Sequence, residues 1–455
     1  MSLNRTHFAF SVVLAALVVF GSDRSTASEM EGVRPLISGR QTLRQVQAFA
    51  LANNPEVSAS AFDRQAAQAR SEGAFGARLP RLTIEGAYNR YDPDLRLTAA
   101  SYNGELGVFG NNILATDLVL RLPLFTGGRL VAEVRAAELL AASADQRLAR
   151  SRGDLLYNVA SLYFSILAQQ RLIASLELSG EALAAHLTQV QTLIAGRKAA
   201  AVDGLRSEVK LADIRQRQSR EQNVLAIQQQ SLLNLLGAGG AAANFSLADE
   251  LQTPAAERAS VATLVETAVQ KRPDVIAIRN ETDAQAARLE AARAGHWPTV
   301  NFVGAVGSRM MNNPAQQPVG HSNNDHVSRV GVTLEIPIFE GGRTAARVDE
   351  EHAKLNAQRE RLNKLLLQVS LEVASASANL ASARDRLTST DKAITLAKKV
   401  FDIEREKYLL ARGTLLDVLD AQSALLDAEA IHIRALADAN TARAQLLWAM
   451  GEAEQ

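Results

Sequence analysis

The sequence predicts a mainly α-helical protein with a small β-part, built from two copies of one architecture. The 455 residues are rich in Ala and Leu, while aromatic residues make up only 5%. This composition favours long helices over compact sheet cores. No proline lies between Pro123 and Pro254 or after Pro337, so each stretch permits long uninterrupted helices. Short motifs also recur in the same order in the two halves of the chain.

Charge and cysteine content exclude several functions. The 49 Lys and Arg residues balance 49 Asp and Glu residues, which argues against a polybasic surface for nucleic acid. The absence of Cys excludes disulfides, Cys-ligated zinc and thiol nucleophiles. We therefore expect no nucleic-acid partner.

Residues 1–28 are predicted to be a signal peptide. Arg5 precedes an apolar run from Phe8 to Phe20, and small residues follow up to Ser28. The alternative, a membrane anchor, is disfavoured because so short a run cannot cross about 30 Å of hydrocarbon. We therefore expect an exported chain that has no transmembrane helix.

The repeated motifs define two copies and a linker. Asn54-Pro55-Glu56-Val57 recurs as Arg272-Pro273-Asp274-Val275, and Leu122-Pro123-Leu124-Phe125-Thr126-Gly127-Gly128-Arg129 recurs as Ile336-Pro337-Ile338-Phe339-Glu340-Gly341-Gly342-Arg343. The offset slips by a few residues inside polar stretches near 92–112 and 311–326, which are predicted to be surface loops. The copies span 42–237 and 260–451, and 238–259 forms the linker.

Each copy has the same predicted order of elements. A helix of about 30 residues follows Asn54-Pro55, and a strand pair comes next (82–91 and 113–122, then 300–309 and 327–336). A helix of about 65 residues follows, which would be about 100 Å long. In the second copy its apolar residues repeat with a strict heptad spacing from Leu362 to Leu387, which predicts a coiled-coil-like seam.

The predicted strands are about 10 residues long and alternate between apolar and polar residues, as in Leu82 to Asn89. This pattern fits transmembrane β-strands, but it also fits a hairpin lying on a soluble core. Four strands cannot close a membrane barrel alone, and open edges are not tolerated in lipid. If the strands span a membrane, several chains must share one barrel.

The duplicated layout, the doubled Pro-[Leu/Ile]-Phe-x-Gly-Gly-Arg motif and the run Leu415 to Gln422 resemble the TolC-type outer-membrane efflux protein family, over about 42–451. The resemblance implies a homotrimer with a 12-stranded β-barrel in outer-membrane lipid, continuous with a long periplasmic α-barrel. It also implies a passive exit duct for efflux or type I secretion. Its partners would be a periplasmic adaptor and an inner-membrane pump, either proton-driven or ABC-type. The resemblance does not identify the cargo.

The resemblance also implies a gate at the periplasmic tip. Tyr408 matches the family's gate tyrosine, Asp417 and Asp420 match two aspartates near the narrow end, and Asp203 holds the equivalent place in the first copy. In a trimer each Asp would form a ring of carboxylates, which favours cations. Gly413 stands where the family has its gate arginine, and Arg412 is a possible substitute. The alternative role for Asp417 and Asp420 is capping near a helix start.

The motif between strand and helix has its own predicted role. Each proline ends the preceding strand, and each glycine pair takes the positive φ that redirects the chain. These residues are Pro123, Gly127, Gly128, Pro337, Gly341 and Gly342.

No enzyme activity, cofactor or metal is expected. The sequence lacks a P-loop, a nucleophile elbow and a dinucleotide fingerprint. The spacing of His321, Asp325 and His326 matches no standard set of metal ligands. The alternative function from a different class is a soluble periplasmic coiled-coil adaptor or scaffold.

Overall fold

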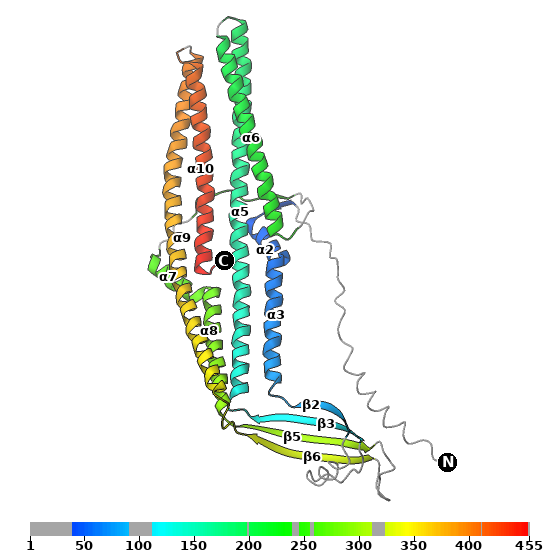
Figure 1. Cartoon of the computed structure of the whole chain (residues 1–455). Helices are drawn as coiled ribbons and strands as arrows, with labels where there is room; N and C mark the ends of the chain where they lie inside the picture. Colours follow the sequence, from blue (N-terminus) through cyan, green and yellow to red (C-terminus); the bar gives the residue numbers. More distant parts are fainter. Residues whose placement is uncertain are drawn as a thin grey trace, which may run out of the picture.

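The computed structural model describes residues 39–90, 112–197, 200–238, 245–254, 259–311, 324–410 and 412–453. The predicted signal peptide, His321 and most of the two predicted surface loops lie outside these residues. The prediction of a mainly α-helical, duplicated fold with a small sheet is confirmed (Figure 1). No helix in the described ranges is both long and apolar enough to cross a membrane.

The two copies contain equivalent elements in the same order. The first has α2 (Leu43–Asn53), α3 (Pro55–Gly76), β2 (Arg81–Arg90), β3 (Asn112–Phe125), α5 (Arg129–Ala195) and α6 (Ala201–Leu235). The second has α7 (Val261–Lys271), α8 (Pro273–Arg293), the 3₁₀ turn η1 (Ala294–His296), β5 (Thr299–Met311), β6 (Asn324–Glu335), α9 (Arg343–Leu409) and α10 (Leu415–Met450). Two short strands, β1 (Gly39–Gln41) and β4 (Phe245–Leu247), pair in parallel.

The long helices α5 and α9 form the frame of the molecule (Figure 1). Each has 67 residues and is therefore about 100 Å long. The predicted heptad seam lies in the core, since Val369, Val373 and Ala376 have no exposed surface. Small seam residues let α9 and α10 pack closely along their shared length.

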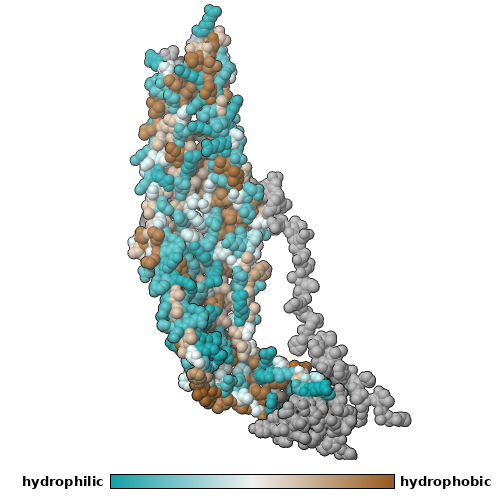
Figure 2. Space-filling view, viewed as in Figure 1, coloured by the Kyte–Doolittle hydropathy of each residue, from teal (hydrophilic) through white to brown (hydrophobic). Residues whose placement is uncertain are grey.

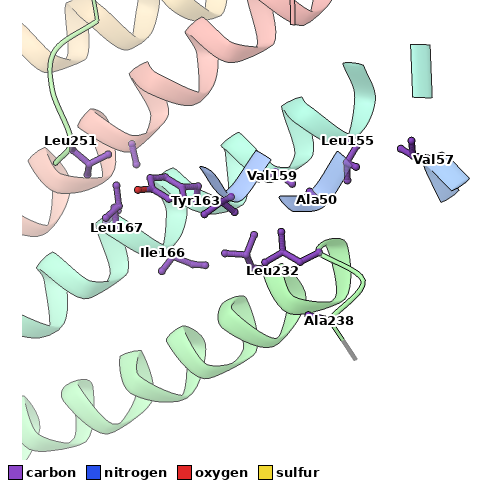
Figure 3. Close-up of a cluster of buried hydrophobic side chains, with 14 of the residues drawn as sticks. Ala50, Val57, Leu155, Val159, Tyr163, Ile166, Leu167, Leu232, Ala238 and Leu251 are labelled. Atoms are coloured by element: carbon purple, nitrogen blue, oxygen red, sulfur yellow. The ribbon is translucent and has the colours of Figure 1, made fainter. Parts of the chain in front are cut away.

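The first copy has an equivalent core at mid-height. Val159 and Tyr163 of α5 pack with Ala50 of α2 and Leu232 of α6, and Figure 3 shows these side chains converging from three helices. The Tyr163 hydroxyl donates a hydrogen bond to a carboxylate oxygen of Asp249 (2.9 Å). That carboxylate also accepts from the backbone N–H of Leu43 (2.7 Å). The predicted linker is thus fastened to α5 and to the start of α2.

The sequence-based boundaries need two corrections. The helix expected to have about 30 residues has 22 residues in α3 and 21 in α8. Helix α3 ends early because a turn at 77–79 precedes Pro80, and proline cannot continue a helix. The separate helices α2 and α7 were not predicted. The strands β1 and β4 were not predicted either, because three-residue strands leave no periodic signal.

Asn54 and Arg272 occupy equivalent elbows in the two copies. Asn54 caps α3 by accepting from the N–H groups of Glu56 and Val57, and it donates to the Leu235 carbonyl at the end of α6 (2.8 Å). Arg272, with 1% of its surface exposed, donates to the Ala449 carbonyl near the end of α10 (3.2 Å). Each elbow therefore holds the end of the last helix of its copy.

Candidate functional site

The four long strands form one antiparallel sheet in the order β2-β3-β5-β6. Cross-strand partners place Ile84, Leu118 and Val306 on one face, and all three side chains are 45% or more exposed. Among the described residues, the sheet's outer strands, β2 and β6, have no partner on one edge. The apolar face and the open edges are the surfaces that a membrane and a second chain would cover.

The opposite face of the sheet carries charged pairs. Arg121 donates to Glu85 across β3 and β2 (2.6 Å), and Arg309 donates to Asp117 across β5 and β3 (2.6 Å). The Asp117 carboxylate lies over Gly307, where an added Cβ atom would clash with it. A polar lining on one face and an apolar surface on the other is the pattern of a water-filled barrel wall.

Both glycine pairs at the strand-to-helix turns have positive φ. Gly127 and Gly128 have φ of +63° and +88°, and Gly341 and Gly342 have φ of +62° and +81°. The left-handed residues Gly128 and Gly342 are the N-caps of α5 and α9. These turns change the direction of the chain from the sheet into the long helices (Figure 1).

The expectation that each proline ends its strand is wrong for Pro123. Strand β3 continues through Pro123 to Phe125, with a register shift between these residues. Pairing with β2 has already ended at Arg121, so one edge of β3 is free at this position. A missing N–H there costs no ladder hydrogen bond, which is why proline is tolerated. Strand β6 ends at Glu335, two residues before Pro337.

The ends of the two long hairpins, residues 186–203 and 405–420, are called the tip below. Tyr408 of α9 is half-buried, and its ring meets His186 of α5 edge-on with 5.4 Å between ring centroids. Burial raises the pKa of Tyr408, and the charge of Asp203 on α6 raises it further. The structure thus brings Tyr408 and Asp203 together and adds His186, which the sequence did not single out.

His186 is the least satisfied polar group at the tip. Its Nε2 atom is buried and has no hydrogen-bond partner among the described residues. Burial lowers the pKa of His186, and the nearby charge of Arg405 lowers it further. A lone His in an apolar helix face gives no sequence signal, so only the packing of α5 against α9 identifies it.

Asp417 forms a capping box at the start of α10. Its carboxylate accepts from the N–H (3.1 Å) and the hydroxyl (2.7 Å) of Thr414, and its own N–H donates to that hydroxyl (3.3 Å). The hydrogen bonds from Thr414 hold the pKa of Asp417 below its usual value. Asp420 lies one turn further along α10 and is exposed. Asp417 therefore has the structural role that the capping alternative describes.

The turn between α9 and α10 is tight at position 413. A Cβ atom on Gly413 would lie 3.1 Å from the Cβ of Lys407. The backbone N–H of Arg412 donates to the Lys407 carbonyl (2.8 Å), and its exposed side chain forms no ion pair with the described residues. Among the described residues, the Arg412 side chain therefore forms neither an ion pair with Asp417 nor a hydrogen bond with Tyr408.

The described residues offer no metal centre. No group of three or more His, Cys, Asp or Glu side chains within them is arranged to hold a metal ion. Backbone pairing places Asp325 and His326 on β6, and the His326 side chain is exposed.

An amphipathic sheet that continues into a bundle of 100 Å helices defines the class of outer-membrane channel proteins. The model of the family described as "Outer membrane efflux protein" matches residues 48–238 and 264–452. This chain belongs to that family. The family comprises channels of the outer membrane rather than enzymes, and most of the chain forms its periplasmic helical part.

Known proteins support this assignment. The outer membrane protein TolC of Vibrio cholerae is 23% identical over 313 residues, covering 67% of each chain. The proteases secretion protein PrtF of Dickeya chrysanthemi is 21% identical, covering 71% of this chain and 70% of PrtF. The crystal structure of VceC from Vibrio cholerae has a TM-score of 0.73 at 18% identity, covering 90% of this chain and 96% of VceC. The last comparison shows that the fold is shared.

Proposed function

We propose that this protein is a homotrimeric exit duct that exports cargo through the outer membrane. The observation that carries the proposal is the four-stranded sheet, which has one apolar face and two open edges. Hydrocarbon cannot satisfy an open edge, so β6 of one chain pairs with β2 of the next until the ring closes. Three chains give 12 strands, and the long helices then enclose a periplasmic tunnel.

The gate lies at the tip in this proposal. Closure depends on the packing of α9 against α5, where Tyr408 meets His186 and faces the charge of Asp203. Asp420 is the better candidate for a selective carboxylate ring, because no interaction is found for its side chain among the described residues. Asp417 carries charge too, but it also caps α10. Arg412 contributes positive charge to the turn and forms no ion pair with the described residues.

The energy for export comes from a partner. Family members include a protein named for protease secretion, so both small-molecule efflux and polypeptide secretion fit this duct. We infer that a periplasmic adaptor links the tip to an energised inner-membrane pump of the proton-driven or ABC type. Photo-crosslinking from position 205 of α6, where the leucine is 62% exposed, would capture such an adaptor in whole cells.

Single-channel conductance in a planar bilayer tests the duct and its selectivity. The protein purified in detergent should give stable, cation-preferring openings. Asp417→Ala/Asp420→Ala should lose that preference while the openings persist. Openings with unchanged selectivity would support the duct but show that neither carboxylate determines the selectivity of the gate. A folded protein that never inserts would overturn the duct and favour a scaffold role.

A further inference from the structure

A cavity of about 730 Å³ lies where α5, α8 and α9 approach the sheet. Five cationic side chains and three carboxylates line it, so its formal net charge is +2. The chain as a whole is neutral, so this is a local excess of positive charge. An excess of this kind attracts an anion.

The excess charge resides on two arginines. The other three cations form ion pairs: Arg129 with Glu133 (3.1 Å), Arg343 with Glu340 (2.6 Å), and Lys354 with both Glu351 (2.8 Å) and Glu350 just outside the lining (2.6 Å). Arg288 of α8 and Arg347 of α9 form no ion pair or hydrogen bond with any described residue. Arg288 lies close enough to Glu351 for its charge to contribute to lowering the pKa of that carboxyl. The two guanidinium groups thus reach one cavity from two different helices, and neither is held by a direct hydrogen bond or ion pair to a described residue.

The cavity adjoins an apolar surface that is almost fully exposed. Ile338 and Phe339, which are 95% and 88% exposed, directly precede Glu340 of the cavity lining. They follow the apolar face of β6, to which Val332 and Leu334 belong. Figure 2 shows hydrophobic surface beside hydrophilic surface at this junction of helices and sheet. Apolar side chains in this position suit acyl chains, and in the proposed duct the cavity, where the sheet meets the helices, would lie at the level of the headgroups.

We propose that this cavity binds the phosphate of a phospholipid headgroup, with Arg288 and Arg347 as its direct contacts. The planar fork of a guanidinium group matches two phosphate oxygens, and charge-assisted hydrogen bonds of this kind are short and strong. Ile338 and Phe339 contact the acyl chains of the same lipid. The site rests on the outer-membrane location of the family and is independent of the proposed gate.

Native mass spectrometry of the detergent-purified protein tests the site. The probes are phosphatidylglycerol, a diacylglycerol with the same acyl chains but no phosphate, and inorganic phosphate. The wild type should retain phosphatidylglycerol and release the diacylglycerol. Arg288→Gln/Arg347→Gln should bind phosphatidylglycerol about 10-fold more weakly or worse, because two charge-assisted contacts are lost.

The matched control is Arg206→Gln/Arg215→Gln, which removes the same charge from exposed positions on α6. This control should bind phosphatidylglycerol like the wild type, and circular dichroism should show that both double variants are folded. Equal lipid binding by the two double variants would overturn the site. If inorganic phosphate binds as tightly as the lipid and depends on the same arginines, the site takes a soluble phosphate and the lipid assignment is wrong.

Discussion

His186 places a titratable ring in the packing between α5 and α9. Its neutral form is favoured, because burial and then the charge of Arg405 lower its pKa. The stability that this neutral ring contributes is complete above the ordinary pKa of 6.5 and is lost as the pH falls toward the lowered value. Protonation of His186 would place a second cation beside Arg405. The charged imidazole would also be poorly solvated, because the ring is buried.

We therefore expect the tip to loosen in mild acid. Hydrogen exchange at 183–195 and 401–410 should be faster at about pH 5.5 than at about pH 7.5, after correction for intrinsic rates. His186→Phe keeps a ring against Tyr408 and should remove the difference. A pH effect of the same size in this variant would assign the sensitivity to another group.

Single substitutions of Asp417 and Asp420 distinguish the effect of helix capping on stability from the effect of losing a negative charge. Asp417→Ala should lower the free energy of unfolding by about 1 kcal/mol, because it breaks the capping box at Thr414. Asp420→Ala should change that free energy by less than about 0.5 kcal/mol, since Asp420 is exposed and lies beyond the cap. Chemical denaturation of the two single variants measures both values. Equal losses would mean that the capping box contributes no more than the exposed carboxylate.

At the scale of elements, the two strand-to-helix turns offer a matched pair of glycines. Gly127 and Gly341 have nearly equal φ values of +63° and +62°. A Cβ atom at Gly127 would lie 2.5 Å from the Cβ of Trp297, whereas nothing lies within 4 Å of a Cβ atom at Gly341.

Gly341→Ala should therefore cost only the backbone strain, about 1–2 kcal/mol. Gly127→Ala should cost that amount and about 1–3 kcal/mol more, because the turn must move away from η1. Thermal unfolding of the two variants in the same detergent compares them. Equal losses would show that the contact with Trp297 relaxes freely.

Arg272 connects three helices of the second copy. Besides the Ala449 carbonyl of α10, it donates to Asp274 of α8 (2.6 and 3.0 Å) and to Glu372 of α9 (2.6 Å). Removing it leaves two largely buried carboxylates without their main partner, so Arg272→Ala should destabilise the protein by about 3–5 kcal/mol. Arg279→Ala, at an exposed position on α8, is the comparison variant. Denaturation midpoints that shift equally in both would rule out a special role for the network.

At the scale of the whole molecule, the open edges of the sheet predict a closed ring. The chain contains no Cys, so one cysteine on β2 and one on β6 report contacts between chains without background. A series of double-cysteine variants pairs one position from 83–87 on β2 with one from 327–331 on β6. At least one of these variants should form a covalently cross-linked trimer on oxidation, and no larger species. Dimers alone would indicate a two-fold interface, and a ladder of larger species would indicate an open assembly.

Local patterns were sufficient for much of the fold. Alternating residues predicted the sheet faces, and the heptad from Leu362 to Leu387 predicted the buried seam of α9. Proline and glycine positions predicted where strands and helices meet, with the exception of Pro123. Proline lacks the backbone N–H that would donate a hydrogen bond to a neighbouring strand. Only the strand pairing shows that β2 no longer pairs with β3 at Pro123, so this bond is not needed.

The candidate site depended more on tertiary structure. The sequence could align Tyr408 and Asp203 by resemblance, but it could not show that His186 of α5 packs against the Tyr408 ring. The cavity with Arg288 and Arg347 also gave no sequence signal, because its cations come from separate helices and only the structure shows which of them form direct ion pairs.

The sequence by itself determined the duplicated architecture, the long helices and the alternating strands. These follow from periodicity and from backbone rules that act within a few residues. Only the tertiary structure decided the strand order, the fastening of the linker to Tyr163 and the side-chain meetings at the tip and the cavity. Such contacts join residues far apart in the chain, and they depend on how helices 100 Å long rotate and slide against one another.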